Sequence, residues 1–526
     1  MLSKKKIIGL MMIFCANVFL FAQKSPIYLE RCNRLEFDQE RLPDCQVLKD
    51  DVVFTHEGAI LYCDSAYFFD KTNSVDAFGH IRMEQGDTLF VFGDILHYDG
   101  NTKMARLKGN VRMINRETTL ETDSMDYDRN IDVGYYFTGG TIYDEKSKLT
   151  SIYGEYSPQT KISKFQNDVR LLNEKTVLGS NDLVYNTISK IAFVKGPTVI
   201  VHEEETTLYT EEGWYNTKTQ QSQGYKSNKI DRLDGKHALA DTLFYDKMKG
   251  EITAFRNVVM WDTIQKLMLR SHYAYARQAD EYMIAYDHAV VHDFSSPKDT
   301  LYLYADTLRS VQDQQDTTIN RAWAIGNVRF FRSDLQGKCD SITFSTKDSI
   351  VNLYEAPVLW ADSMQLSGEF MQIYTENKKP KMLHVQSWAA AAMREDSIRF
   401  SQLSGKSLKG YIRDNQLYKI LVEGNAETIY YPKEEDGSLV GVNRAESSAL
   451  TVYVKNKDLE KIVMTPNSSG VLYPEDQFPE NLKYLKNYSW QEDVRPKDKL
   501  DIFRRNPKIE KVEDDSKKKK KRRRKK

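Results

Sequence analysis

The sequence predicts an all-β protein built as a stack of antiparallel strand repeats. Residues 86–113, GDTLFVFGDILHYDGNTKMARLKGNVRM, alternate apolar residues with others. A period of two places one face of each strand against a core and the other against water. The intervening Asp99-Gly100-Asn101 suits a tight reversal. Because this stretch recurs along the chain, we expect many similar hairpins rather than one.

Two short patterns carry the recurrence. In the first, an Asp is followed at two-residue steps by an apolar and an aromatic residue: Asp64-Ala66-Phe68, Asp94-Leu96-Tyr98, Asp123-Met125-Tyr127, Asp241-Leu243-Tyr245, Asp340-Ile342-Phe344 and, with Asn, Asn181-Leu183-Tyr185. The second runs from Ala105 to Val111 and returns near Gly79, Gly326 and Gly424. Asp64 and Asp94 lie 30 residues apart, as do Gly79, Gly109 and Gly139. A fixed period in this range predicts stacked repeats.

The repeated D-x-L-x-Y-D and A-x-L-x-G-N-V-x-M patterns resemble the OstA/LptA-like family of periplasmic lipopolysaccharide-transport proteins, over roughly residues 50–455. The resemblance implies an elongated, open β-jellyroll whose apolar groove holds lipid acyl chains. It implies no catalysis and no cofactor. The expected partners are lipopolysaccharide and other jellyroll components of a transport bridge in the periplasm, at the outer or inner membrane. The chain is several times longer than the short bridge proteins, and it has no evident barrel domain.

The strand periodicity assigns inward-facing residues for this groove. We expect the lipid-binding set to comprise Leu96, Tyr98, Ala105, Leu107, Val111, Met113, Leu243, Tyr245 and Val328. Lys108 should face outward. The ends of the stack should expose unpaired strand edges, which favour joining to a similar jellyroll. The residues expected at these edges are Val52, Thr451, Val452 and Tyr453.

The termini differ from the body in composition. Residues 1–22 read as a secretory signal, with basic Lys4–Lys6 and an apolar run too short for a comfortable membrane span; the rival reading is an uncleaved anchor. Ten basic residues, Lys517–Lys526, end the chain. Setting these thirteen basic residues aside leaves 62 of the 75 against 75 acidic residues, so the body is acidic and nucleic-acid binding is not expected. The tail is expected to clamp an anionic membrane surface, dock an acidic partner, or remain solvated.

The predicted organisation follows the repeats. Residues 1–22 form the signal, 23–50 an N-terminal cap, 51–311 and 312–455 two parts of the jellyroll, 456–507 an irregular segment, and 508–526 a disordered basic tail. The polar loop Gln312–Thr318 divides the two jellyroll parts. Trp388 with the following alanines suggests a helical turn. In the irregular segment, Trp490 and Asp501–Phe503 are candidate docking contacts.

The sequence contains few motifs that point to catalysis or metal binding. It contains no P-loop, nucleophile elbow or zinc-protease motif, and the repeated Asp residues suit corner hydrogen bonds to local backbone amides better than catalysis. His288 and His292 are the one close His pair, and we expect them to be surface residues. Cys32 and Cys45 are the best candidate pair for a disulfide in an exported chain. The alternative function is a structural or adhesive exported β-repeat protein with a filled core, which bulky interlocking inward residues would favour over a groove.

Overall fold

A computed structural model describes residues 25–505 except Lys298, Lys378, Asn415, Glu435, Asn456 and Lys457. The predicted signal, residues 1–22, and the basic tail with Lys517–Lys526 lie outside the described residues. Within them the chain is an antiparallel β-jellyroll; its only helices are short 3-10 turns. The described residues contain no helix that is long and apolar enough to cross a membrane.

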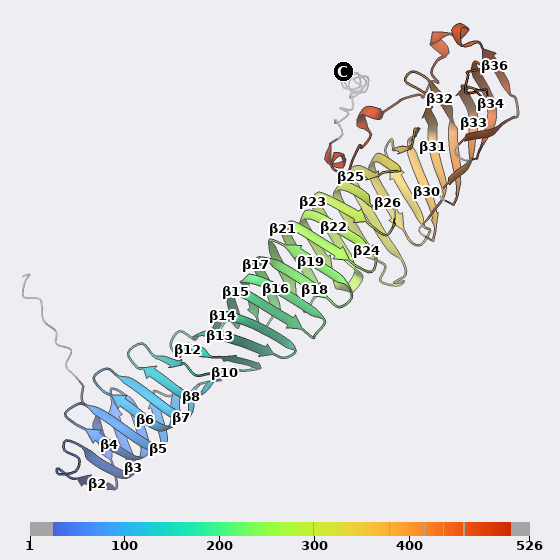
Figure 1. The fold of residues 1–526 in the computed structure, drawn as a ribbon. Helices are drawn as coiled ribbons and strands as arrows, with labels where there is room; N and C mark the ends of the chain where they lie inside the picture. Colours follow the sequence, from blue (N-terminus) through green and yellow to red (C-terminus); the bar gives the residue numbers. More distant parts are fainter. Residues whose placement is uncertain are drawn as a thin grey trace, which may run out of the picture. The chain divides into compact units, whose positions relative to one another are not determined.

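The described chain forms two compact units that meet at Lys226 and Ser227. In the first unit, the long strands from β3 to β8 and from β13 to β16 lie side by side in chain order (Figure 1). Its strands are β1 (Tyr28–Arg31), β2 (Arg34–Phe37), β3 (Gln46–His56), β4 (Ala59–Phe69), β5 (Ser74–Gln85), β6 (Leu89–Asp99), β7 (Met104–Asn115), β8 (Thr118–Asp128), β9 (Val133–Tyr136), β10 (Gly140–Asp144), β11 (Ser147–Ser151), β12 (Tyr153–Ser157), β13 (Ile162–Asn173), β14 (Thr176–Asn186), β15 (Ile191–His202), β16 (Thr206–Asn216) and β17 (Gln221–Lys226).

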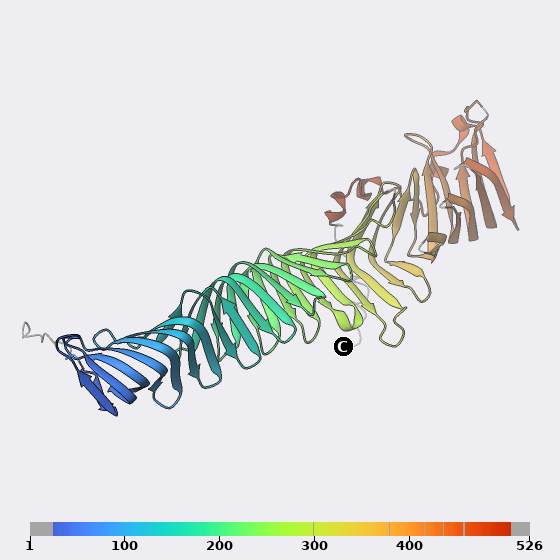
Figure 2. The same ribbon diagram turned by 60° about the horizontal axis from the view of Figure 1, so that its bottom comes forward.

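The second unit repeats the same hairpin arrangement (Figure 2). Its strands are β18 (Asn228–Arg232), β19 (Lys236–Ala240), β20 (Thr242–Asp246), β21 (Glu251–Asp262), β22 (Leu267–Arg277), β23 (Tyr282–Asp293), β24 (Leu301–Gln312), β25 (Asn320–Arg332), β26 (Leu335–Ser345), β27 (Ile350–Tyr354), β28 (Val358–Ala361), β29 (Met364–Ser367), β30 (Phe370–Glu376), β31 (Lys379–Arg394), β32 (Phe400–Arg413), β33 (Gln416–Tyr430), β34 (Val442–Lys455), β35 (Asp458–Thr465) and β36 (Ser469–Tyr473). Its 3-10 turns are η1 (Gln278–Asp280), η2 (Glu475–Gln477), η3 (Glu480–Leu482), η4 (Glu492–Val494) and η5 (Asp501–Phe503). The loop Gln312–Thr318, expected to divide two jellyroll parts, lies inside this unit between β24 and β25.

Most long strands bend at a corner near their middle. In β7 the corner is Gly109-Asn110, where both residues have positive φ (75° and 47°) and the register with β6 and β8 shifts. Gly79-His80 in β5 and Gly326-Asn327 in β25 have the same conformation. The two left-handed residues turn the strand without ending it, so one strand contributes to both halves of its unit.

The hairpin turns form two rims in each unit. In the first unit, the first rim comprises the turns at 57–58, 86–88, 116–117, 145–146, 174–175 and 203–205, and the second those at 70–73, 100–103, 129–132, 158–161, 187–190 and 217–220. In the second unit, the first rim includes the turns at 263–266, 294–300, 333–334, 362–363 and 395–399, and the second those at 247–250, 278–281, 313–319 and 346–349. Inward-facing side chains between the corner and the rims form the core.

The structure corrects both expected strand edges. β1 and β2 pair with β3, so the predicted N-terminal cap covers the edge expected at Val52. At the other end, Thr451, Val452 and Tyr453 pair with β35, because the repeats continue beyond Val454. The unpredicted short strands β1, β2, β35 and β36 were hard to recognise because they lack the Asp and Gly signatures.

Two local expectations were also wrong. Trp388 and the following alanines lie in β31, with Trp388 exposed at the corner, because strand pairing with β32 overrides the helix propensity of alanine. Cys32 and Cys45 are free thiols, as are Cys63 and Cys339. Cys63 and Cys339 occupy the buried corner position that Gly93 takes in β6.

Candidate functional site

Side chains join neighbouring strands at the corners. Asn110 Nδ2 donates to Asp94 Oδ2 (2.7 Å), and His80 Nδ1 lies 2.7 Å from Asp64 Oδ2. A Cβ on Gly109 would lie 2.6 Å from Asp94 Oδ2, so glycine provides both the positive φ and the space for the carboxylate. The same contact recurs between Asn257 and Asp241 and between Asn327 and Asp306. The recurring Asp is therefore structural, but its bond reaches a neighbouring strand instead of the local backbone.

The predicted groove residues of the first unit all point inward. Leu96, Ala105, Leu107 and Met113 are at most 1% exposed, and the remaining two, Tyr98 and Val111, are also buried. Lys108 is exposed on the opposite face, as the alternation predicted. The interior at these residues is filled by side chains.

Polar residues seal this interior between the two rims. Beside the first rim, His56 is 3% exposed and its Nδ1 lies 2.6 Å from the hydroxyl of Tyr98, beside the second rim. His56 Nε2 lies 3.0 Å from the Ser25 carbonyl, which can only accept, so Nε2 carries the proton and Nδ1 accepts from Tyr98. Arg129 Nη1 donates to the Tyr98 hydroxyl (2.6 Å). Burial lowers the pKa of His56, which favours this neutral form.

The same bond between rims recurs along the first unit. Tyr185 donates to Asp144 Oδ2 (2.8 Å), and the hydroxyls of Tyr127 and Tyr215 lie 3.1 Å from Gln85 Oε1 and 3.3 Å from Asn173 Oδ1. Both hydroxyls also lie 3.0 Å from a second acceptor beside the second rim, Asp132 and Gln220, and these two residues in turn bond Gln85 (2.9 Å) and Asn173 (2.6 Å). We call the pairs Tyr185–Asp144, Tyr127–Gln85, Tyr215–Asn173 and Tyr98–His56 the clasp. Burial raises the pKa of Tyr215 to about 12, so its hydroxyl remains a proton donor.

A buried charge pair strengthens the middle of the clasp. Asp144 is 2% exposed and accepts from Lys190 Nζ (2.8 Å) and Thr118 Oγ1 (3.2 Å) in addition to Tyr185. Lys190 also pairs with Glu145 (3.0 Å), and hydrogen bonds to both carboxylates raise the pKa of Lys190 against the opposing effect of burial. The interior of the first unit is thus closed by a bonded polar row.

In the second unit, apolar residues take the inward positions beside both rims. Tyr245 ends the same Asp-apolar-aromatic pattern as Tyr98. Strand register carries the position of Tyr245 on to residues that are apolar except Ser310: Ile252, Ala276, Met283, Ser310, Ala322, Phe344, Val351 and Ile373. On the other half, the inward positions include Met260, Val291, Leu303, Leu335, Leu366 and Leu403. These six, with Met283, Val351 and Ile373, are only half-buried. An ion pair between Lys236 and Glu281 (2.7 Å) also links the two rims.

Small side chains line the interior of the second unit near the corner. Ala254, Ala274, Ala285, Ala289 and Ala305 are fully buried beneath the half-buried apolar residues. Leu243, Tyr245 and Val328, the predicted groove residues of this unit, are buried in the same interior. We call the half-buried apolar lining, Met260, Met283, Val291, Leu303, Leu335, Val351, Leu366, Ile373 and Leu403, the trough.

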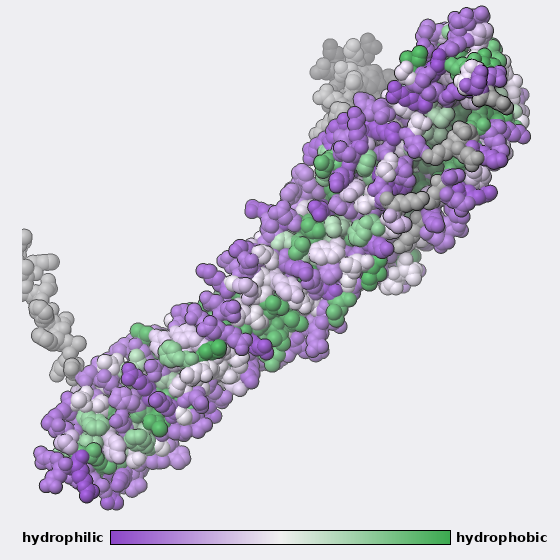
Figure 3. All heavy atoms as spheres, in the orientation of Figure 1, coloured by the Kyte–Doolittle hydropathy of each residue, from purple (hydrophilic) through white to green (hydrophobic). Residues whose placement is uncertain are grey.

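The half-buried apolar lining suits contact with apolar chains. Half-buried apolar side chains gain from being covered, at about 25 cal/mol per Å² of apolar surface removed from water. The described residues contain no group of three or more His, Cys, Asp or Glu side chains able to hold a metal ion. From the outside, hydrophilic residues cover most of the visible face, with apolar patches between them (Figure 3).

Sequence reasoning missed the clasp and the trough. The clasp had a readable signal, because His56, Gln85, Asn115, Asp144 and Asn173 follow one another at 29–30-residue steps, like the tyrosines. The trough had a weaker sequence signal, because the apolar residues that replace the tyrosines after Tyr245 form no fixed motif.

Comparison with known proteins gives one family match. The profile of the family described as OstA-like protein matches residues 24–181 and 166–234. Among solved structures, LptH from Pseudomonas aeruginosa, described as the LptA-homologous periplasmic component of the lipopolysaccharide transport device, is 11% identical, with a TM-score of 0.21 over 27% of this chain and 95% of its own. No curated protein matches. The family match lies almost wholly in the first unit, and the trough lies beyond it.

Proposed function

Since the chain belongs to the OstA-like family through residues 24–234, we propose that it binds lipopolysaccharide in the periplasm and passes it on without covalent chemistry. The acyl chains occupy the trough of the second unit. The observation that carries this proposal is the half-buried apolar lining beside both rims. Each methylene that enters gains about 0.8 kcal/mol. Outer-membrane assembly is the process that such a carrier serves.

The first unit has a different role in this proposal. The tentative groove residues Leu96, Tyr98, Ala105, Leu107, Val111 and Met113 lie beneath the clasp. A chain could enter there only after buried hydrogen bonds break, each leaving an unpaired polar group at about 1–3 kcal/mol. This unit acts as a closed spacer, which favours the filled-core alternative for this part of the chain alone.

Other jellyroll proteins of a transport bridge are the proposed partners. β35 and β36 each pair with β34 on one side and offer their other edges to a strand of the partner. Substituting Pro for Val463 or Val471 should weaken this association while lipid still binds. The tail Lys517–Lys526 is proposed to hold the protein near anionic head groups, at about 1 kcal/mol per basic residue.

Site-specific photocrosslinking to lipopolysaccharide tests the trough. Ile373 points inward and is half-buried, whereas Gln372, the preceding residue on β30, bonds Asn352 on the outer face. A photoreactive residue at position 373 should capture lipopolysaccharide, while one at 372 should not. A third, at Leu107, should capture little because the clasp covers it. Capture at 107 without capture at 373 would place the lipid in the first unit and refute the trough.

A further inference from the structure

A C-terminal segment crosses the outside of the second unit. Residues 474–505, which we call the strap, follow β36 and carry the turns η2 to η5 (Figure 1). The strap lies on the outer face of the half that contains β25, β26, β29, β32 and β34, opposite the trough. The candidate docking contacts belong to it: Trp490 packs against Phe400, and Ile502 is buried against Val290 and Tyr304.

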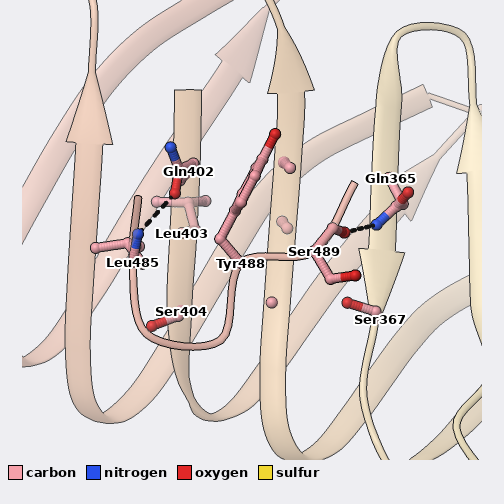
Figure 4. A pocket seen from close by; sticks show the side chains of 11 residues that line it. Gln365, Ser367, Gln402, Leu403, Ser404, Leu485, Tyr488 and Ser489 are labelled. Atoms are coloured by element: carbon pink, nitrogen blue, oxygen red, sulfur yellow. Dashed lines mark hydrogen bonds between the residues drawn. The ribbon is translucent and has the colours of Figure 1, made fainter. Parts of the chain in front are cut away.

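Two glutamine side chains form hydrogen bonds with the backbone of the strap. Gln402 Oε1 accepts from Leu485 N (2.9 Å), and its Nε2 donates to the Lys483 carbonyl (3.0 Å). Gln365 repeats this pattern six residues further along the strap, with Gln491 N (2.8 Å) and the Ser489 carbonyl. Figure 4 shows Gln402 and Gln365 reaching the strap from separate strands. Each amide bonds the carbonyl of one residue and the N–H of the residue two positions later, as a neighbouring strand would.

Apolar anchors and charges complete the contact. Among the strap side chains, Leu485, Pro496 and Ile502 are buried. Asp493 lies near Lys338 and Asp501 near Arg329, and each carboxylate opposes the lowering of the pKa of its basic neighbour by burial. Arg329, 1% exposed, donates to the Val494 carbonyl (3.0 Å). The strap carries seven acidic and seven basic residues, so it is a charge-balanced segment that places two of its carboxylates near basic residues of a glutamine-bearing face.

We infer that this outer face is a peptide-binding site, and that the strap is its resident, exchangeable ligand. The bonds run to the strap's backbone and to a few anchors, as in recognition of extended peptides. The sheet beneath has its own strand pairing, and its main core lies on the opposite side, whereas the strap adds two small apolar clusters. We therefore expect the sheet to stay folded when the strap leaves. The class of ligand is a peptide that offers backbone N–H and carbonyl groups to the glutamines and apolar side chains as anchors.

Cutting the strap in place tests this inference in the full chain. A protease recognition sequence inserted between Asp476 and Gln477, which are both exposed, allows cleavage after folding. The released fragment should co-elute with the body on gel filtration, and an excess of dye-labelled peptide of residues 477–505 should replace it. Immediate loss of the fragment with failure of the peptide to bind, or a fragment that never exchanges, would overturn the inference. Circular dichroism before and after cleavage checks that the body stays folded.

Matched variants test the mode of recognition. Gln402→Ala and Gln365→Ala should each weaken peptide binding about tenfold, because the strap's N–H and carbonyl lose their partners. Gln372→Ala makes the same change on the other half of the unit and should leave binding unchanged. Equal affinity of all three variants for the peptide would show that Gln402 and Gln365 do not contribute to recognition of the strap.

Discussion

The two units differ in what they place beside their rims. The first unit sets tyrosines opposite His56, Gln85, Asp144 and Asn173 and bonds its rims together across the interior. The second sets apolar residues there, and a segment braces it from outside. The clasp covers the inward side chains of the first unit, whereas the trough side chains of the second unit stay half-exposed and the strap lies on the outer face. The polarity of one inward row therefore decides whether the same hairpins form a sealed core or an open one.

Removing the centre of the clasp should have the largest effect. Asp144→Ala leaves Tyr185 with only the longer contact to Thr217 Oγ1 (3.3 Å) and Lys190 with Glu145 alone, which should destabilise the first unit by about 3 kcal/mol or more. Denaturant-induced unfolding, monitored by amide exchange in β8–β16, measures this loss of stability. Asp87→Ala, at an exposed position in the turn 86–88, should change stability by less than about 0.5 kcal/mol. Equal effects would mean that the clasp contributes nothing.

The same truncation in both interiors should cost different amounts. Leu107→Ala removes a side chain that is 1% exposed and should destabilise by about 2–5 kcal/mol. Leu303→Ala removes a half-buried side chain and should cost about 1 kcal/mol, because less surface leaves the core. Unfolding curves of the two variants, recorded under the same conditions, measure both losses of stability. A larger loss at Leu303 would show that the second interior is as closed as the first.

The corners should behave alike in both units. Gly109→Ala and Gly326→Ala each place a Cβ against an Asp carboxylate at positive φ, at 2.6 and 2.8 Å, and should each cost about 2 kcal/mol. Gly179→Ala meets nothing within 4 Å and is the control. If Gly326→Ala were harmless, the units would differ at their corners as well as at their rims. Thermal melts are sufficient for this comparison.

The smallest expected effect depends on pH. Burial lowers the pKa of His56 below its ordinary 6.5, so the unfolded chain binds more protons than the folded chain near and below that pH. Stability of the first hairpins should therefore fall as the pH drops through 6.5, and His56→Gln should flatten this dependence. Asp64 raises the pKa of exposed His80, so its contribution has the opposite sign and is lost as pH rises. Amide exchange of β3 at pH 5.5 and 7.5 tests the sign.

Sequence patterns predicted the structural features that depend on residues close together in the chain. Alternation placed Leu107 inside and Lys108 outside, and the Gly-Asn pair marked the corner, because both follow from strand geometry. The clasp joins residues about 42 positions apart, as in Tyr98 and His56, across two hairpins. No pattern within a short stretch of sequence predicts which clasp residues pair, although the regular spacing of these residues was visible. The strap contacts strands up to 165 residues away through backbone atoms, which leave no trace in side-chain patterns.

The corner pair in each long strand has a consequence for how the chain changes in length. Because the strand bends without ending, its pairing partners remain its neighbours in sequence, and loop-closure entropy stays small. Each bent hairpin can therefore form on its neighbour as a unit of a nearly one-dimensional array. Insertion or deletion of a whole hairpin preserves every register, whereas loss of a single strand reverses the direction of all that follow. Chains of this kind should thus vary in length by two-strand steps.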